Sequence, residues 1–538
     1  MSKQGRILIV DDQKNWREEL AETLRRNGFS AEPVGNTADA LKHLSTAIYH
    51  IVILDIHFEN DDPTNTEGIT LLRELSGLGL NEATRVIMLT GYGTLEQARE
   101  AFKDYDVADF VSKTDAGTTL LKSVQQIFDQ KLKINLGLGI RWQTKKEIEQ
   151  IVGNLKINGK RFATNATLRR QVMEELEDLL CRLFYEAEMV LVRPLTQGWS
   201  GSGVLLVQPY FKDSGRGEDV IVKFGDMNKI KGEHYNFQRY VKNLLSGARC
   251  TTVNDVRYTA HLGGIVYSLL GAGKDQLVDF AQFYQNTDDI ARIIDVLDRL
   301  FEDTCANWYI NRSRIQPLAL VTEYQRFFNY SRKKLERILT KHLPSIYLQE
   351  KLEFASLNSN RKFTNPLLTR TDPSFTCYTY TCIMHGDLNQ HNLFVDQAGF
   401  TWLIDFQATE PGHILRDLAM LDSVIRFQLL TAQEATLEER LRMEEVLCSA
   451  SHFGQLQQMT SEFAVGNRAL EKAFASVIHL RTLAAKKVMQ GRNDDLNEYY
   501  IALFYNALNT LKFPTLETVQ HEHALLCASL LADRPGLC

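Results

Sequence analysis

The sequence predicts a multidomain α/β protein, and three observations support this. A chain of 538 residues is long enough for about three to four domains of roughly 150 residues each. Hydrophobic residues make up 44% of the chain, which supplies the apolar material for several cores. From residue 6, short apolar runs typical of strands alternate with segments of helical periodicity, whereas the segment 431–538 shows helical spacing.

Composition restricts the class of partner. The 61 Lys and Arg residues and 67 Asp and Glu residues leave a net charge of −6, which gives no electrostatic reason to expect a nucleic acid or an anionic membrane. No helix-turn-helix pattern or basic stripe follows the N-terminal region, so direct DNA binding is not expected. The 8 cysteines form no CxxC pair and no apolar run reaches a membrane-spanning length, so we expect a cytoplasmic protein without a membrane partner.

The N-terminal region predicts a parallel sheet. Strand-like runs alternate here with helical patterns, at 7–10, 51–54, 86–89 and 110–111 for the strands and at 16–26, 69–75 and 95–102 for the helices. Strands that are joined through helices form right-handed crossovers, so the sheet should be parallel and covered on both faces. Ligands of such sheets bind at the carboxyl ends of the strands.

Polar side chains follow each of these strands. Asp11 and Asp12 end the first run, Asp55 ends the second, Thr90 ends the third and Lys113 follows the last. Carboxylate oxygens suit Mg²⁺, which also pairs with phosphate oxygens. A solvated loop end is the alternative for any one of these residues, but it does not account for five of them in this order.

Residues 5 to about 130 resemble a response-regulator receiver domain, to which we assign residues 1–130. The resemblance implies a flavodoxin-like (βα)5 fold and a sensor histidine kinase as partner. It also implies that Asp55 is the phosphoacceptor, and that Mg²⁺ is held by Asp11, Asp12 and Asp55 together with the backbone carbonyl of His57. The implied switch residues are Thr90, Phe110 and Lys113.

Two features depart from this family's pattern. The segment 57–67 is longer and more acidic than usual, and Thr114 replaces the proline that normally follows the lysine. For these two reasons, the family pattern does not predict how long the phosphoryl group stays on Asp55 or which donor supplies it. The acidic segment lacks the ligand spacing and the central glycine of a calcium loop, so we interpret it as a solvated loop.

Residues 131–189 are interpreted as a helical linker. Leucines recur at helical spacing between residues 168 and 183, with charged residues between them. Two roles stay open for this helix: packing on the following domain, or signalling and dimerisation, which leaves a homodimer open. Either role would couple the two halves of the chain.

The segment after residue 190 carries a second set of motifs. A Gly/Ser turn with Gly198, Gly201 and Gly203 lets backbone N–H groups approach a phosphate, although a plain hairpin turn explains it equally well. Lys223 lies in the middle of an apolar run, and Glu233 follows ten residues later on a predicted helix. Together they suggest the Lys–Glu pair that positions nucleotide phosphates in kinase folds.

The strongest motif is HGDLNQHN at 385–392, followed by IDF at 404–406. It resembles the catalytic core of protein-kinase-like phosphotransferases, above all the aminoglycoside and choline kinase branch. The resemblance implies a bilobal α+β domain at 190–430, with an N-lobe at about 190–272, a C-lobe from about 273, and a helical extension of the C-lobe at 431–538.

The resemblance also implies a role for each motif residue. Asp387 would accept the proton of a substrate hydroxyl, and Asn392 and Asp405 would bind Mg²⁺. His385 and Asp417 would support the catalytic loop. The residues implied for ATP binding are Gly198, Gly201, Gly203, Lys223 and Glu233.

Two hypotheses follow. In the first, a bacterial two-component regulator is phosphorylated on Asp55 and thereby controls a fused ATP-dependent phosphotransferase that acts on a hydroxyl acceptor. In the second, the C-terminal half is a pseudokinase that senses nucleotide and serves as a signalling scaffold. The two differ in whether Asp387 is needed for turnover. The acceptor or protein partner, the cognate histidine kinase and the direction of control are not readable from the sequence.

Overall fold

The computed structural model describes residues 4–58, 67–77, 83–91, 103–114, 116–161, 164–196, 201–245, 251–269, 277–343, 349–357, 361–369, 376–459, 463, 466–488 and 495–534. Within these ranges, no helix is long and apolar enough to cross a lipid bilayer. The chain divides into two compact units, residues 1–234 with 252–268 and residues 235–251 with 269–538.

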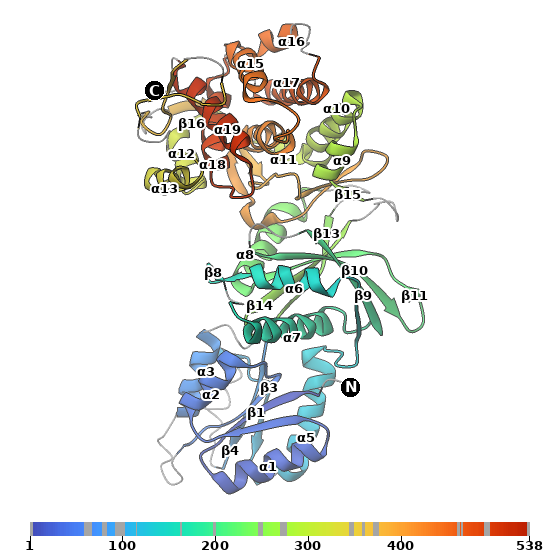
Figure 1. Ribbon diagram of the computed structural model, residues 1–538. Helices are drawn as coiled ribbons and strands as arrows, with labels where there is room; N and C mark the ends of the chain where they lie inside the picture. Colours follow the sequence, from blue (N-terminus) through green and yellow to red (C-terminus); the bar gives the residue numbers. More distant parts are fainter. Residues whose placement is uncertain are drawn as a thin grey trace. The chain divides into compact units, whose positions relative to one another are not determined.

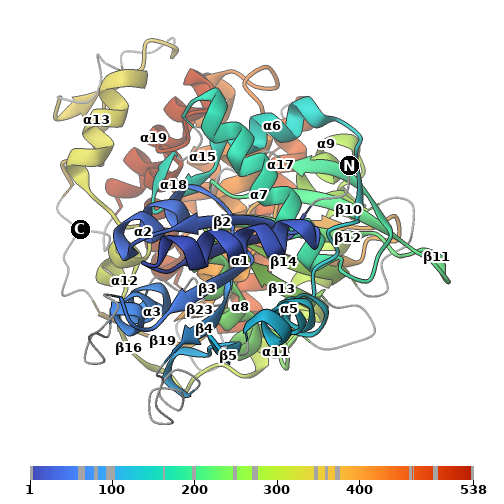
Figure 2. The ribbon, with the colours of Figure 1, turned by 90° about the horizontal axis from the view of Figure 1, so that it is seen from below.

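The first unit begins with a five-stranded parallel sheet in the order β2-β1-β3-β4-β5, the topology of a flavodoxin-like receiver fold (Figure 1). One face is covered by α2 and α3, and the other by α1 and α5 (Figure 2). The predicted helix at 95–102 lies outside the described residues. The elements are β1(Arg6–Val10), α1(Lys14–Arg26), β2(Ser30–Val34), α2(Thr37–Thr46), β3(Ile51–Asp55), α3(Glu67–Gly77), β4(Arg85–Thr90), β5(Asp109–Ser112), α5(Ala116–Gln126) and η2(Ile127–Leu132).

The amino-acid pattern explains the order of these strands. β1 and β3 are central, are apolar on both faces and are almost entirely buried. β2 is an edge strand that contains Glu32 and Pro33, and an edge position tolerates both a charge and a missing N–H donor. Gly68, the second residue of α3, lies directly against β3, where a Cβ atom would lie 2.1 Å from the carbonyl oxygen of Asp55.

The first unit continues with a second sheet in the order β13-β14-β12-β10-β9-β6, with β11 paired to β10. β6 is parallel to β9, and the pairings β9–β10, β10–β12 and β12–β14 are antiparallel. The elements are β6(Gly139–Trp142), α6(Lys145–Asn154), β7(Lys156–Ile157), β8(Lys160–Arg161), α7(Ala166–Leu183), β9(Met189–Thr196), β10(Gly203–Phe211), β11(Gly215–Arg216), β12(Val220–Asp226), α8(Met227–Asn236), β13(Thr251–Tyr258) and β14(Leu262–Leu269).

The segment 131–189 differs from the all-helical linker that the sequence predicts. It contains β6 and the β7–β8 hairpin as well as α6 and α7. The apolar side chains of Ile140 and Trp142 pack on the same core as the second sheet, which explains why this short stretch joins that sheet. Of the two roles left open for the leucine-rich helix, the structure shows packing: Leu176, Leu179 and Leu180 of α7 belong to that core.

The second unit is mainly helical, with several short paired strands. Four helices, α15, α17, α18 and α19, correspond to the helical spacing predicted beyond residue 431. The elements are η3(Phe237–Val241), β15(Val278–Asp279), α9(Phe280–Asn286), α10(Ile290–Asp298), η4(Arg299–Thr304), α11(Ala306–Ile310), β16(Gln316–Ala319), α12(Leu320–Phe327), α13(Arg332–His342), β17(Lys351–Leu352), β18(Phe363–Thr364), β19(Thr376–Thr379), β20(Thr381–Met384), β21(Leu393–Val395), β22(Thr401–Leu403), η5(Phe406–Ala408), β23(Glu410–His413), α14(Arg416–Val424), η6(Ile425–Leu429), α15(Leu437–Ser449), η7(Phe453–Gln455), α16(Leu456–Met459), α17(Arg468–Val488), α18(Asn497–Thr510) and α19(Thr518–Ala532).

A buried ion network joins the helices of this second unit. Asp422 accepts hydrogen bonds from Arg426 (2.6 Å) and Arg481 (3.0 Å). Glu444 accepts one from Arg426 (2.7 Å) and contacts Nε2 of His523 at 2.8 Å. All five side chains have no exposed surface, so their charges are balanced by each other rather than by water.

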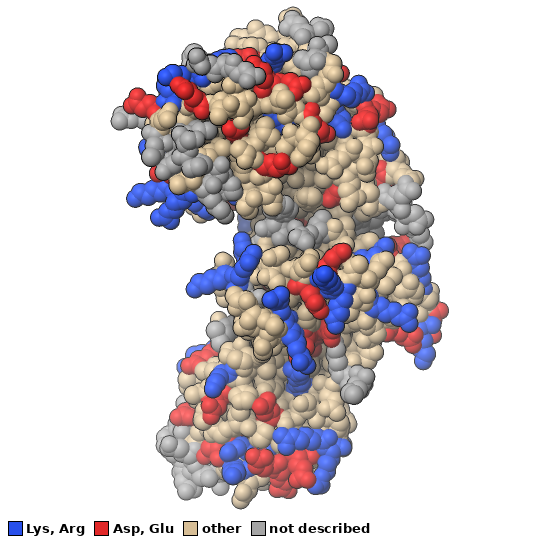
Figure 3. Space-filling view, viewed as in Figure 1, with Lys and Arg blue, Asp and Glu red and all other residues tan. Residues whose placement is uncertain are grey.

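On the surface of the protein, the face shown in Figure 3 carries basic and acidic side chains that are interspersed.

Candidate functional site

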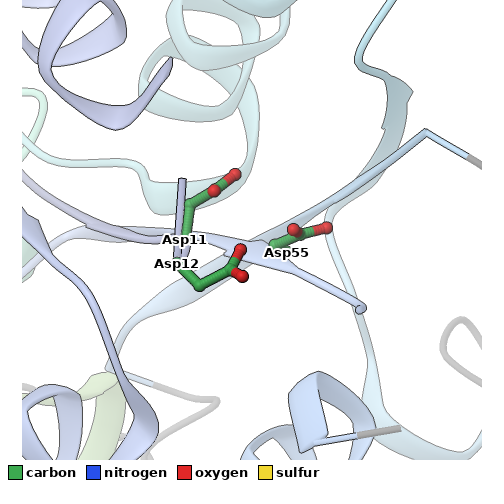
Figure 4. A group of neighbouring side chains, drawn as sticks. All are labelled: Asp11, Asp12 and Asp55. Carbon is green, nitrogen blue, oxygen red and sulfur yellow. The ribbon is translucent and has the colours of Figure 1, made fainter. Parts of the chain in front are cut away.

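Three carboxylates meet at the carboxyl edge of the first sheet. Asp11 directly follows β1, Asp12 is next along the chain, and Asp55 is the last residue of β3. One carboxylate oxygen from each residue lies within 4.8 Å of those of the other two. Figure 4 shows the three side chains grouped together. Asp11 and Asp55 are buried, and Asp12 is half-buried. The predicted acidic residues are therefore brought together at one point.

Lys113 follows β5 and reaches this cluster. Its Nζ atom lies 2.8 Å from Oδ2 of Asp11 and 2.7 Å from Oδ2 of Asp55. Burial lowers the pKa of Lys113, but its hydrogen bonds to the two carboxylates outweigh burial and leave that pKa above its usual value. Burial raises the pKa of the Asp55 carboxyl, and Lys113 opposes this only in part.

The donor set fits a magnesium ion. Three carboxylates face one ammonium, so the cluster keeps an excess of negative charge in a largely buried setting. Hard oxygen ligands of this kind are those that Mg²⁺ prefers. The backbone N–H of His57 donates a hydrogen bond to the Asp55 carboxylate and thereby favours its charged form.

The predicted switch residues are described to different extents. Thr90 ends β4 and pairs with Ser112 of β5, while its side chain lies outside the described part of the chain. Phe110 lies on β5 and is partly buried against the core that contains Met88. Thr114 contacts Ser112 through their hydroxyl oxygens at 2.7 Å. Most of the acidic segment 57–67 lies outside the described residues.

One residue of this site was not predicted. Arg17 of α1 donates hydrogen bonds from Nη1 to the backbone carbonyls of Asp11 (3.2 Å) and Asp12 (2.8 Å). It therefore fixes the loop that presents two of the three carboxylates. An arginine that bonds to backbone oxygens leaves no local sequence pattern by which it could be found.

The second set of predicted residues is divided between the two units. In the first unit, Nζ of Lys223 on β12 lies 2.6 Å from Oε2 of Glu233 on α8. The residues are 1% and 0% exposed, respectively, so the pair is closed to water. Tyr267 of β14 donates a hydrogen bond to the other carboxylate oxygen of Glu233. The sequence did not single out this tyrosine as a partner.

The glycine turn lies between β9 and β10, which pair as an antiparallel hairpin. Gly198 lies outside the described residues. Gly201 has a φ of +80° and accepts a hydrogen bond from the backbone N–H of Lys156, whose side chain packs against it. Gly203 begins β10, where a Cβ atom would lie 2.3 Å from the ring of Phe224. The turn is thus in contact with the β7–β8 hairpin.

In the second unit, the HGDLNQHN segment connects β20 to β21 and is fixed by Asp417. The Asp417 carboxylate accepts hydrogen bonds from the backbone N–H groups of His385 (2.7 Å) and Gly386 (2.9 Å). Burial raises the pKa of this carboxyl, although both N–H groups favour its charged form. Gly386 has a φ of +80°, and a Cβ atom there would lie 2.3 Å from the carbonyl oxygen of Ala408.

Asp387 and Asn392 are brought together by the same loop. Nδ2 of Asn392 donates to the backbone carbonyl of Asp387 (2.8 Å) and to its carboxylate (3.2 Å). β21 pairs with β22, and the backbone N–H of Ile404 donates to the carbonyl of Asn392 (3.0 Å), which sets Asp405 beside this loop. His385 contacts the carbonyl of Ile404 through Nε2 at 2.9 Å.

The backbone of Asp405 is strained. Its φ of 68° and ψ of 66° lie in the left-handed region, which a residue other than glycine seldom adopts. Such conformations cost of the order of 1–3 kcal/mol and cluster at functional sites. Four other described non-glycine residues share a positive φ, so this conformation agrees with the motif at 404–406 but does not identify the site by itself.

The parallel sheet, the three carboxylates and the lysine define a response-regulator receiver domain, and the family model of that description matches residues 7–125. The chain belongs to the family described as ternary complex associated domain 9, whose model matches residues 187–343 and 357–512, more than half of the 538 residues. Neither match is to a kinase family, so the phosphotransferase stays a prediction.

Curated relatives match the N-terminal region. The C4-dicarboxylate transport transcriptional regulatory protein DctD of Rhizobium meliloti is 28% identical over 131 residues, which cover 24% of this chain and 27% of DctD. A putative response regulator, NtrX-like, of Rickettsia bellii is 31% identical over 160 residues, covering 28% and 30%. The chain thus spans less than a third of the length of these two relatives. A solved CheY-like receiver from Methanospirillum hungatei matches 24% of this chain with 23% identity and a TM-score of 0.22.

Proposed function

We propose that the chain is a two-component response regulator in which phosphorylation of Asp55 controls a kinase-like, ATP-dependent phosphotransferase in the same polypeptide. The buried Lys223–Glu233 pair carries the second part of this proposal. Placing two opposite charges in a core costs hydration energy, which good geometry and additional hydrogen bonds must compensate. A lysine on a sheet, held by a helix carboxylate, is the arrangement by which kinase folds orient nucleotide phosphates.

In the receiver, the Asp55 carboxylate would attack the phosphorus of a phosphohistidine. The oxygen–phosphorus bond forms as the phosphorus–nitrogen bond breaks, and the histidine nitrogen leaves with the electron pair. Asp11, Asp12 and Asp55 would hold Mg²⁺, which neutralises charge on the phosphoryl oxygens when it is bound. Lys113, already paired with Asp55, supplies the remaining positive charge to the phosphoryl group.

In the kinase-like half, Asp387 would accept the proton of the acceptor hydroxyl. Its carboxylate is oriented by Nδ2 of Asn392 at 3.2 Å. Asn392 and Asp405 supply oxygen ligands for Mg²⁺, which would neutralise the charge on the ATP phosphates when bound. Lys223 would bind the α- and β-phosphates, and Glu233 would hold its ammonium in place.

A nucleotide-sensing scaffold is the second candidate, and two observations favour it. Lys156 of β7 packs on Gly201 and donates its backbone N–H to the Gly201 carbonyl at 3.0 Å. A glycine turn that is held by a neighbouring hairpin has less freedom to close over phosphates. The family description, ternary complex associated, also favours a role in an assembly.

The test is calorimetric titration of the full chain with ATP and Mg²⁺, with and without beryllofluoride as a phosphoryl mimic on Asp55. We expect binding that weakens at least about tenfold in Asp405→Ala. Asp303→Ala is the matched control, since it makes the same change at an exposed position of η4. Absence of ATP binding in both receiver states would reject the proposal.

Turnover separates the two candidates once binding is established. ATP consumption in the presence of small hydroxyl acceptors should fall at least about a hundredfold in Asp387→Asn, which removes the base, while ATP affinity is retained. ATP consumption that is equal in the two proteins would favour the scaffold.

A further inference from the structure

Helix α7 carries an unusual stripe of buried charged residues. Glu175, Asp178 and Arg182 are 4%, 5% and 3% exposed. Their spacing of three and four residues places them along one side of the helix. Charged side chains are almost never buried without partners, so the partners of this stripe show what α7 connects.

Two of these residues contact the receiver. Nε2 of His50 lies 2.7 Å from Oδ1 of Asp178, and Nη1 of Arg182 donates to the carbonyl of Ala83 at 2.8 Å. Arg182 and Asp178 also bond to each other at 2.8 Å. Nδ1 of His50 accepts from the backbone N–H of Arg6, so Nε2 carries the proton that is donated to Asp178.

These contacts lie at the starts of the two strands that carry the phosphorylation site. His50 immediately precedes β3, which ends at Asp55, and Ala83 lies just before β4, which ends at Thr90. The two strand starts are also bonded to each other, because the backbone N–H of Arg85 donates to the carbonyl of His50 at 2.9 Å. A strand of five or six residues spans about 17–20 Å, so α7 holds the ends opposite to the site.

The same helix packs on the sheet that carries Lys223. Glu175 accepts hydrogen bonds from the hydroxyl of Thr259 (2.7 Å) and from the backbone N–H of His261 (2.6 Å), in the turn between β13 and β14. A Cβ atom on Gly264 of β14 would lie 2.9 Å from Leu179 of α7, so helix and strand are in close contact.

Strand β14 is in turn part of the Lys223 site. Its residue Ile265 pairs with Lys223 of β12, and its residue Tyr267 donates to Glu233. The receiver, α7, β14 and the Lys223–Glu233 pair thus form one series of direct contacts within the first unit.

From these contacts we infer that α7 transmits the phosphorylation state of the receiver, through the His50–Asp178–Arg182 bridge at the starts of β3 and β4, to the Lys223–Glu233 pair. Only the test that uses ATP affinity rests on the proposed function. Packed elements move between discrete arrangements rather than deforming continuously. A shift of β3 against β4 on phosphorylation would therefore move the two anchor points of α7 relative to each other.

Hydrogen exchange on the full chain tests the transmission without nucleotide. Addition of beryllofluoride and Mg²⁺ should change exchange of the α7 amides between 172 and 183 at least about fivefold, together with the amides around Asp55. The α7 response should fall below about twofold in Asp178→Asn, with the response around Asp55 retained. Glu174→Gln, the same change one turn away in an exposed pair with Arg6, should keep the wild-type response.

Unchanged α7 exchange, while the amides around Asp55 respond, would overturn the inference. So would a response in folded Asp178→Asn equal to that of the wild type. If Asp178→Asn does not fold, His50→Ala replaces it, since this variant leaves the Asp178–Arg182 pair intact and removes the contact of Asp178 with the receiver.

A second readout uses the ratio of ATP dissociation constants with and without beryllofluoride. We expect a ratio of at least about fivefold in the wild type and in Glu174→Gln, and of less than about twofold in Asp178→Asn. Equal ratios in Asp178→Asn and the wild type would overturn the inference. If no ATP binds, the proposed function fails, and the hydrogen exchange of α7 alone decides the inference.

Discussion

The receiver site and the Lys223 site both place a buried lysine against carboxylates, but their charge balance differs. At the receiver site, Lys113 pairs with Asp11 and Asp55, and Asp12 belongs to the same cluster of carboxylates. Lys223 faces Glu233, whose other oxygen accepts from a neutral tyrosine. The receiver cluster holds more carboxylates than ammonium groups, whereas the Lys223–Glu233 pair matches one positive charge with one negative charge.

This difference separates two uses of buried charge. The receiver cluster is unbalanced until a metal binds, so its stability and conformation depend on a ligand. The Lys223–Glu233 pair and the ion network of Asp422 and Glu444 match opposite charges, so they fix the positions of their elements before any ligand binds. Four predictions test this comparison, from the largest expected effect to the smallest.

Breaking the balanced pair should have the largest effect. Glu233→Ala leaves the Lys223 ammonium buried without its carboxylate, and we expect the free energy of unfolding of the first unit to fall by about 3–5 kcal/mol. Denaturant titration, with hydrogen exchange of the β12 amides to identify the unit, measures this change. The double variant Lys223→Met with Glu233→Leu should recover most of the loss. A loss below about 1 kcal/mol in Glu233→Ala would show that the pair is not buried as described.

The buried ion network of Asp422 and Glu444 should lose stability at low pH, because it contains His523. Burial lowers the pKa of His523 from 6.5 to about 4, although Glu444 partly opposes this. The pKa of His523 is lower in the folded than in the unfolded chain, so neutral His523 contributes its full stabilisation above pH 6.5. As the pH falls towards 4, the free energy of unfolding should decrease by roughly 3 kcal/mol. Thermal unfolding of the wild type and His523→Gln between these pH values measures the effect. Equal slopes for the two proteins would contradict it.

Removing a negative charge from the receiver cluster should stabilise the protein, whereas the two preceding changes destabilise it. Without Mg²⁺, Asp12→Asn relieves repulsion among the three carboxylates, and we expect the receiver to gain roughly 1 kcal/mol of unfolding free energy. With Mg²⁺, the same variant should bind the ion at least about tenfold more weakly. Thermal unfolding at several Mg²⁺ concentrations shows both effects. A destabilised Asp12→Asn in the absence of Mg²⁺ would mean that the cluster is not overcharged.

The features that the sequence predicts are local: buried strands with continuous apolar runs, and site residues a few positions apart. β1 and β3 are buried on both faces and read as continuous apolar runs, whereas β2 was not recognised because an edge strand with Ser30, Glu32 and Pro33 lacks such a run. The five-residue step from Asp387 to Asn392 is local, and both residues do lie on one loop.

The long-range contacts could not be predicted in the same way. His50 and Asp178 are 128 positions apart, and Arg182 binds a backbone carbonyl rather than a side chain. No periodicity connects such partners, because their distance is set by how α7 packs on two different sheets. The strand β6 was missed for a related reason: four residues are too short to show an alternation.

The smallest effect should come from a balanced pair that is exposed. Arg332 and Glu336 of α13 lie one helical turn apart, with Nε and Oε1 separated by 2.7 Å and side chains 53% and 31% exposed. Water already stabilises both charges, so Glu336→Gln should change the free energy of unfolding of the second unit by less than about 0.5 kcal/mol. Denaturant titration at low and high salt measures this change. Because this pair is as balanced as Lys223–Glu233 and differs in exposure, an equal loss in the two variants would mean that burial does not set the strength of these pairs.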